Sequence, residues 1–222
     1  MTRIGILGAG RVGSSLARAL AAAGHEVTLG HRQSPVQTRQ SPVQTDAHET
    51  GAARPIRIAD QRATAATADL VINATPGDSA LARLSALDTE LTGKILIDVS
   101  NATRHSPDGI PAELCYPGSS LAEQLQEALP ATQVVKTLNT MLFPVMTAPA
   151  SLSTPPTAYL SGNDTQAKAV AAGLLSDLGW QPGWIEDLGD ITTARATEAL
   201  VLLVPHVLRR SGFQPFAVSL AR

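Results

Sequence analysis

Three glycines near the start of the chain have the spacing of a phosphate-binding loop. Residues 8–13 read GAGRVG, which is the pattern G-x-G-x-x-G, between an apolar stretch that predicts a strand and an Ala/Leu-rich stretch that predicts a helix. In this pattern Gly8 permits a tight turn, Gly10 lets the backbone approach a pyrophosphate, and Gly13 lets the helix pack on the strand. Free amides at the start of the helix then face two phosphates. The predicted dinucleotide contacts are Gly8, Ala9, Gly10, Arg11, Val12 and Gly13.

The end of the second predicted strand indicates which dinucleotide binds. A chain that uses NAD carries Asp or Glu there, about 20 residues on, to accept hydrogen bonds from the ribose 2′-hydroxyl. This chain has His31 and Arg32 instead. A guanidinium holds a 2′-phosphate through charge-assisted bonds of about 1.5–3 kcal/mol, so we predict NADP(H), preferred on the order of 10- to 150-fold. His31 is placed to stack on adenine or to add charge when protonated. The alternative is that both side chains are solvated loop residues.

Small and polar residues follow three further predicted strands. Open parallel sheets bind ligands outside the carboxyl ends of their strands, where the strand order reverses. The candidate residues at these ends are Ala74, Thr75 and Pro76, then Ser100 and Asn101, then Asn139, Thr140 and Met141. We expect the first group to run along the cofactor and the last group to face the nicotinamide. A simple turn is the alternative for Asn101.

The remaining sequence offers few acids or bases for catalysis. It has no Ser-His-Asp set, no HExxH zinc pattern and no Walker loop. Arg195 and Glu198 are three positions apart on a predicted helix, which favours a structural ion pair over a catalytic one. His206 lies on an apolar helix face, as core histidines do. Direct hydride transfer between two bound rings mainly needs positioning and exclusion of water, so neither a catalytic side chain nor a metal ligand is assigned.

The order of the predicted elements gives the framework for these residues. Strand, glycine turn, helix and strand within about 30 residues make one parallel βαβ unit with a right-handed crossover. Strands are expected at 3–7, 26–29, 56–58, 70–74, 95–99 and 133–138, and helices at 11–23, 60–68, 79–91 and 121–129. Ser120 and Glu123 have capping-box spacing for the last helix. Together they predict an α/β fold, an NAD(P)-binding Rossmann domain with a doubly wound parallel sheet of about six strands.

The C-terminal part is expected to be a small α/β extension. We predict an NADP-binding domain over residues 1–138 and a small second part over 139–222. Strands at 158–161 and 182–186 flank a helix at 164–178. Asp190 is placed to N-cap a long last helix that Gly212 ends. This helix is apolar nearly all round over 199–208, which predicts burial, with a second subunit as one possible cover.

Composition excludes several other classes of protein. With 44% hydrophobic and 16% charged residues, the chain can build a large core. Its net charge is −2 without any Lys/Arg block, so no nucleic-acid surface is expected. The single cysteine, Cys115, excludes an intramolecular disulfide and a cysteine-rich metal site. The start lacks a signal-peptide pattern, and the longest apolar run is far below the roughly 20 residues of a membrane span, so we expect a cytoplasmic protein with no membrane contact.

Residues 33–46 are a tandem duplication, QSPVQTR followed by QSPVQTD. Two prolines and many polar neighbours predict an exposed loop. It is either a flap over the adenosine end of the cofactor or a tolerated insertion.

The motifs together resemble the NADP oxidoreductases of the deazaflavin coenzyme F-420 (hereafter F420), a family related to the cytosolic domain of the Steap metalloreductases. The similar segments are 5–32, 72–76, 119–141, 159–180 and 188–212; VVKTLNT and TTARATEAL are the most distinctive parts. The resemblance implies NADP contacts at 8–13, His31, Arg32 and 74–76. It also implies an acceptor pocket around 139–141 near the last helix, and a homodimer.

The activity that the resemblance implies is hydride transfer between NADPH and a small-molecule acceptor, F420 or another flavin as co-substrate. Three features depart from the family: members that use F420 can carry His where Asn139 stands, the duplication is not part of the pattern, and aromatic residues are few. Two alternatives stay open. One is an NADP(H)-binding redox sensor without turnover. The other is a short enzyme of the β-hydroxyacid dehydrogenase or imine reductase type. This alternative is weakened because the chain has a short C-terminal part and no catalytic lysine on a helix with a nearby Asn or Asp.

Overall fold

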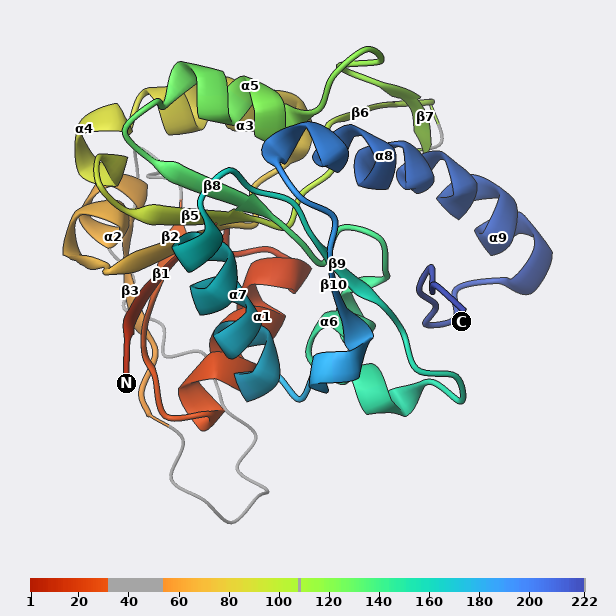
Figure 1. Ribbon diagram of the computed structural model, residues 1–222, viewed down its shortest axis with the longest axis horizontal. Helices are drawn as coiled ribbons and strands as arrows, with labels where there is room; N and C mark the ends of the chain where they lie inside the picture. Colours follow the sequence, from red (N-terminus) through yellow and green to blue (C-terminus); the bar gives the residue numbers. More distant parts are fainter. Residues whose placement is uncertain (32–53, 108, 222) are drawn as a thin grey trace.

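A computed structural model describes residues 1–31, 54–107 and 109–221 of the chain. Arg32 and the duplication at 33–46 lie outside the described residues. The centre of the molecule is a six-stranded, all-parallel sheet with strand order β3-β2-β1-β4-β5-β8 (Figure 1). Its strands are β1 (Arg3–Leu7), β2 (Glu26–His31), β3 (Arg57–Asp60), β4 (Leu70–Asn73), β5 (Ile95–Asp98) and β8 (Gln133–Lys136). The order reverses between β1 and β4, which confirms the predicted doubly wound Rossmann sheet.

Helices cover both faces of this sheet, which is why its central strands are almost wholly apolar. Within β4, Val71 and Ile72 point to opposite faces because successive side chains of a strand alternate. Ile72 packs in the cluster under α1 (Arg11–Ala22) and α7 (Thr165–Asp177). Val71 packs in the cluster under α2 (Gln61–Thr67), α3 (Gly77–Ser85) and α5 (Leu121–Ala128). Each fully buried Leu or Ile in these two clusters contributes about 1.5–3 kcal/mol to folding.

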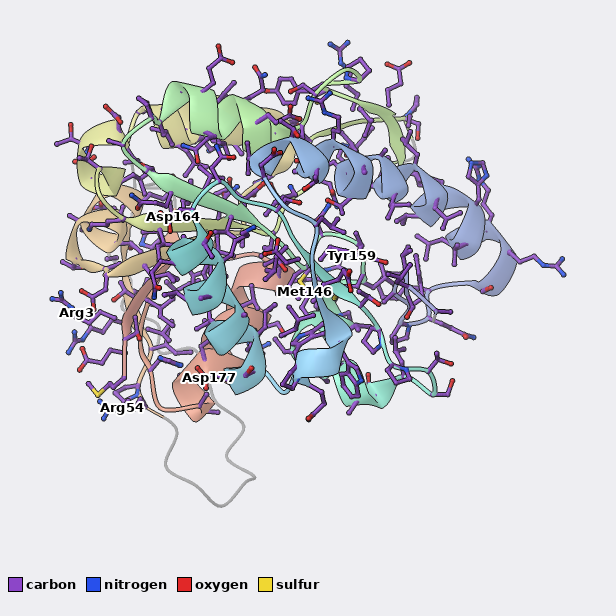
Figure 2. The ribbon with its side chains drawn as sticks, viewed as in Figure 1. Arg3, Arg54, Met146, Tyr159, Asp164 and Asp177 are labelled. Atoms are coloured by element: carbon purple, nitrogen blue, oxygen red, sulfur yellow. The ribbon has the colours of Figure 1, made fainter. Side chains whose placement is uncertain are left out.

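Several helices begin at a residue whose side chain caps them. Ser120 accepts a hydrogen bond from the Glu123 amide at 3.1 Å, which confirms Ser120 as the cap of α5, and its hydroxyl donates to the Glu123 carboxylate at 2.9 Å. Asp164 caps α7 in the same way, through the Ala167 amide at 2.7 Å. Figure 2 labels Asp164 and Asp177 at the two ends of α7. The helix predicted at 79–91 is instead two helices, α3 and α4 (Asp88–Leu91), because the chain leaves helical geometry at Leu87.

Two short elements were not predicted, and both lie near the carboxyl edge of the sheet. A hairpin of β6 (Thr103–His105) and β7 (Pro111–Leu114) follows β5, and the helix α6 (Phe143–Met146) follows β8. Each has too few residues to show a period in the sequence. They matter because they form walls of the site described below.

The C-terminal part attaches to the main sheet at the end of β8. Strands β9 (Ala158–Leu160) and β10 (Ile185–Asp187) pair in parallel around α7. The Lys136 amide donates to Ser161 O at 2.9 Å, and the Ser161 amide donates back to Lys136 O at 3.1 Å. Where the sequence predicted a strand from 182, a 3₁₀ turn, η2 (Pro182–Trp184), comes first, because Pro182 fixes its φ and has no amide to donate.

The last helix is long and apolar as predicted, but only part of it is buried. It runs through η3 (Ile191–Thr193), α8 (Ala194–Ala199), η4 (Leu200–Leu203) and α9 (Val204–Ser211), from the predicted Asp190 cap to Gly212. Its inner side packs on α5 and β7. Leu203 on its outer side is 45% exposed, and Pro205 is the one buried residue of α9. The expected burial of the whole helix is therefore wrong for a single chain, because α9 extends beyond the elements that cover α8 (Figure 1).

The same stretch bears on the expectation that the chain makes no membrane contact. Among the described residues, Ile191–Ser211 is the one helical stretch long and apolar enough to cross a membrane by length and composition. In this structure 33% of its most apolar window is buried. Core helices of soluble proteins pass the same test, so this property alone assigns no membrane location.

A buried lysine ties the last helix to the sheet. Lys136 Nζ lies 2.8 Å from Asp98 Oδ2 and 2.8 Å from Glu198 Oε1, and it also donates to the Ser100 carbonyl. The Lys136 side chain is 1% exposed. Burial opposes its charge, but the attraction of Asp98 and Glu198 outweighs burial, so the pKa of Lys136 is raised above its ordinary value. The lysine therefore stays charged, and its three donors are all satisfied.

Glu198 also joins the last helix to α5. Its carboxylate accepts hydrogen bonds from the Leu121 amide at 3.0 Å and the Ala122 amide at 3.3 Å, in the first turn of α5. The positive end of the α5 dipole thus offsets the second carboxylate beside Lys136. The predicted pairing of Arg195 with Glu198 is wrong. Glu198 faces inward, while Arg195 lies on the exposed side and pairs with Glu123.

Replacement of Lys136 by Met should destabilise the fold strongly. It leaves Asp98 and Glu198 buried without a cation, and breaking a buried pair in this way costs about 3–5 kcal/mol. Urea unfolding of Lys136→Met and of Arg195→Ala gives the comparison. Arg195→Ala removes an exposed ion pair and should shift the midpoint far less. Equal midpoint shifts in the two variants would contradict the role given to Lys136.

Candidate functional site

A cleft of about 970 Å³ opens along the carboxyl edge of the sheet, at the reversal between β1 and β4. Its walls come from the glycine loop, the loops after β4 and β5, the β6–β7 hairpin, α6 and the last helix. Twelve of the sixteen residues predicted for the site line it, namely Gly8, Ala9, Gly10, Arg11, Val12, His31, Ala74, Thr75, Pro76, Ser100, Asn101 and Met141. The fold thus brings together residues that the sequence predicted from separate strand ends.

The glycine loop has the geometry that its sequence predicted. Gly8 has φ +112°, and a Cβ there would lie 2.5 Å from Ala74 O. A Cβ at Gly13 would lie 1.8 Å from Gly8 O, so Gly13 is a packing residue behind the cleft. A Cβ at Gly10 would meet nothing within 4 Å, because Gly10 faces the open cleft. No side chain caps α1, so its first amides are left for a ligand in the cleft.

A buried polar network holds the loops after β4 and β5 together. Asn73 Nδ2 donates to Asp98 Oδ1 at 2.8 Å, and Asn73 Oδ1 accepts from the Thr75 amide at 3.1 Å and hydroxyl at 2.7 Å. The Ser100 hydroxyl donates to the same Asp98 oxygen at 2.7 Å. The other oxygen of Asp98 binds Lys136. The side-chain oxygens and nitrogens named here all have hydrogen-bond partners within the protein. Thr75 and Ser100 are therefore fixed before any ligand arrives.

The segment after β8 bends sharply at Leu138. This buried, non-glycine residue has φ +59°, a left-handed conformation that costs on the order of 1–3 kcal/mol. The bend returns Asn139 toward the loop after β5. Asn101 Nδ2 donates to Asn139 O at 2.8 Å, and Asn139 Nδ2 donates to Asn101 Oδ1 at 3.0 Å. Asn139 and Thr140 are therefore buried behind the wall rather than on it, and Met141 is the residue of this group that reaches the cleft.

Cationic side chains line the end of the cleft beside β2, where the sequence analysis expects the adenosine. We call this the adenosine end. A second hollow of about 500 Å³ shares His31, Gln61 and Arg83 with the main cleft, so the space continues past the end of β2. Arg83 Nε donates to Ser79 Oγ on its own helix at 3.1 Å. Arg62 lines this hollow too, but it pairs with Glu90. Arg83 and Gln61 were not predicted, since a lone polar residue on a helix gives no signal in the sequence.

The opposite end of the cleft is apolar and is built mainly by later parts of the chain. Met141, Leu142, Phe143 and Met146 line it, and Val201 comes from the last helix. Figure 2 marks Met146 in the middle of the molecule, where the N-terminal and C-terminal parts meet. This end can take a flat ring beside a bound nicotinamide.

The described residues offer neither a metal centre nor an activated thiol at the cleft. No group of three or more His, Cys, Asp or Glu side chains in the part of the chain that the structure describes could hold a metal ion. Cys115 packs against the apolar cluster beside α3 and α5, and this burial raises the pKa of its thiol. A thiol with a raised pKa is a poor nucleophile at neutral pH. The arrangement suits reactions that depend on positioning.

Comparison with known proteins agrees with this geometry. Residues 3–102 match the family model described as NADP oxidoreductase coenzyme F420-dependent. A candidate F420-dependent NADP reductase from Arthrobacter sp. FB24 is 37% identical, with each chain covered over 100% of its length and a TM-score of 0.86. A hypothetical protein from Sinorhizobium meliloti is 29% identical over 87% of this chain and 88% of its own, with a TM-score of 0.64.

A curated relative extends the comparison to a larger protein. Metalloreductase STEAP3 of Rattus norvegicus is 28% identical over 204 residues, which are 90% of this chain and 36% of the rat protein. The chain thus spans about a third of that relative. The full-length match to the Arthrobacter protein carries the assignment: the chain belongs to the coenzyme F420-dependent NADP oxidoreductase family and is an NADP-dependent oxidoreductase on a Rossmann fold.

Proposed function

We propose that this enzyme transfers a hydride between NADPH and a flavin-like acceptor, either F420 or another flavin. The observation that carries the proposal is one continuous cleft with two chemically different ends. The glycine loop and the cations lie toward one end, and the apolar residues of α6 and the last helix lie at the other. Two rings held side by side in such a cleft can exchange a hydride without help from a nucleophile or metal.

The cofactor would lie along the carboxyl edge of the sheet. Its pyrophosphate would sit against the first amides of α1, in the space that Gly10 leaves open. Ala74 to Pro76 would run along the nicotinamide half. The 2′-phosphate would meet Arg32, on the evidence of the sequence, with His31 at the mouth of the adenosine end.

The acceptor would lie against Met141, Phe143, Met146 and Val201. Methionine and aromatic side chains make good contacts with flat conjugated rings, and methionine adapts its shape to them. These apolar walls would also keep water from the hydride while it moves. The loops that hold Ser100 and Asn101 are fixed by the Asp98 network, so the two rings would meet a rigid wall.

The homodimer that the resemblance implies stays a prediction. The outer side of the last helix and the segment after it offer a surface for it, since Leu203 is 45% exposed and Phe213 is 62% exposed.

The acceptor is identified by following NADPH absorbance with a panel of compounds. We expect oxidation with F420 or with a free flavin, and slower or no oxidation with ferric chelates, keto acids and cyclic imines. Binding of NADPH without oxidation by any of them would instead support a redox sensor. Turnover confined to keto acids or imines would support the short β-hydroxyacid dehydrogenase or imine reductase type.

Alanine at two glycines should separate cofactor binding from folding. Gly10→Ala places a methyl group in the space proposed for the pyrophosphate, and Gly10 has the extended φ of −77°, which alanine tolerates. We expect an unchanged melting temperature and NADPH binding weakened by at least about 10-fold, which is about 1.4 kcal/mol. Gly13→Ala collides with Gly8 O and should lower the melting temperature. NADPH titrations and thermal melts of both variants check this, and a Gly10→Ala enzyme with normal NADPH affinity contradicts the placement.

Arg32→Ala should remove most of the preference for the phosphorylated cofactor. We expect the Kd for NADPH to rise on the order of 10- to 150-fold, while the Kd for NADH changes little, because NADH has no 2′-phosphate. Calorimetry with both cofactors measures this. Arg18→Ala is the matched control, since Arg18 is an exposed cation on α1 that lines neither hollow. Equal losses for NADPH and NADH in Arg32→Ala would refute the assignment.

A further inference from the structure

The β6–β7 hairpin brings a titratable side chain to the acceptor end of the cleft. Thr103 and His105 both line the cleft, because alternate residues of β6 point to the same face. Arg104, between them, does not line the cleft, and its charge partly offsets the rise that burial causes in the pKa of the Cys115 thiol. His105 was not predicted as a site residue, because it lies in a segment for which the sequence predicts no structure.

The hairpin has an irregularity that fixes this orientation. Thr103 pairs with Leu114 and Arg104 with Glu113, but His105 pairs with Pro111, so β7 carries one extra residue at this step. A bulge of this kind re-aims the side chains beside it. Here it sets Pro111 opposite His105, and both residues line the cleft. The hairpin also packs on η4, the element that contributes Val201 (Figure 1).

The proposed reaction needs a proton at this end of the cleft. A hydride carries two electrons and one hydrogen from C4 of the nicotinamide to the acceptor ring. The reduced ring is then anionic at a nitrogen until it takes a proton. Among the residues that the structure describes, five that line the main cleft have ionisable side chains: Arg11, His31, Asp78, Arg83 and His105. Arginine is not a proton donor at neutral pH, and His31 lies at the adenosine end.

We propose that His105 is the proton donor to the reduced acceptor, an inference that rests on the proposed function. As the hydride arrives, the His105 imidazolium gives its ring proton to the acceptor nitrogen, and the N–H bond of the histidine breaks as the new N–H bond forms. Neutral His105 then regains a proton from water, because its side chain is exposed at the mouth of the cleft. In the reverse direction the neutral imidazole accepts the same proton.

Two carboxylates lie on the elements beside His105. Asp78 lies in the first turn of α3, which packs on β6, and it lines the same cleft. Glu113 lies on β7 next to the pair formed by His105 and Pro111. Asp78 is the competing proton donor, and it has a separate arm in the test.

The test is His105→Gln, assayed with the acceptor from the panel on which the unmodified enzyme turns over. We expect kcat to fall on the order of 100-fold, which is typical for loss of a general acid. The Kd for NADPH, measured by its fluorescence, should stay within about twofold, and free imidazole should restore part of the lost kcat. A structural role would not be rescued by imidazole. His206→Gln, at an exposed position of α9 that does not line the cleft, is the matched control.

Each other outcome decides against His105. A His105→Gln enzyme that keeps its kcat within about twofold overturns the proposal. So does a loss that imidazole does not rescue, or one matched by an equal loss of NADPH affinity. A large loss in Asp78→Asn with normal turnover in His105→Gln would move the role to Asp78. If the unmodified enzyme fails to oxidise NADPH with every acceptor of the panel, the proposed function itself fails, which is a separate result.

Discussion

The buried ammonium of Lys136 is the interaction on which the rest of the site depends. A charge in a protein interior is tolerated only when every donor is satisfied, so the positions of its partners are tightly constrained. Those partners are Asp98 at the end of β5, the Ser100 carbonyl in the next loop and Glu198 on the last helix. One charged atom therefore positions the sheet, a cleft loop and the C-terminal helix relative to each other. Apolar contacts are less directional, so they would define these positions less specifically.

From Lys136 a chain of hydrogen bonds runs behind the cleft wall. Asp98 binds Asn73 and Ser100, and the next residue, Asn101, pairs with Asn139. These polar groups satisfy one another, so the apolar side chains of the acceptor end are left to face the cleft. The strained φ of Leu138 is held in place by the same arrangement, since it is what turns Asn139 toward Asn101. A wall of this kind is already in place and needs little rearrangement when ligands bind, as hydride transfer requires.

The sequence predicted the parts of this structure that depend on neighbouring residues. The glycine loop, the parallel strands and the caps at Ser120 and Asp190 are local, and they lie where the patterns placed them. Interactions between distant residues were missed. A helix pattern pairs Glu198 with Arg195, and only the packing of α8 on α5 turns Glu198 toward Lys136. The exposed side of α9 was missed for the same reason, whereas the hairpin and α6 were missed because they are too short to show a period.

This division between local and distant residues also separates the two halves of the cleft. The groups proposed for the phosphates of NADP lie within the first βαβ unit, where backbone geometry dictates their types. The acceptor end combines α6, the hairpin and Val201, three segments far apart in the chain. None of these residues shares a hydrogen bond with the glycine loop among the contacts of the described residues. Under the proposed function, substitutions in the hairpin or the last helix would therefore change the acceptor while the cofactor site keeps its shape, so one fold can serve reductases with different acceptors.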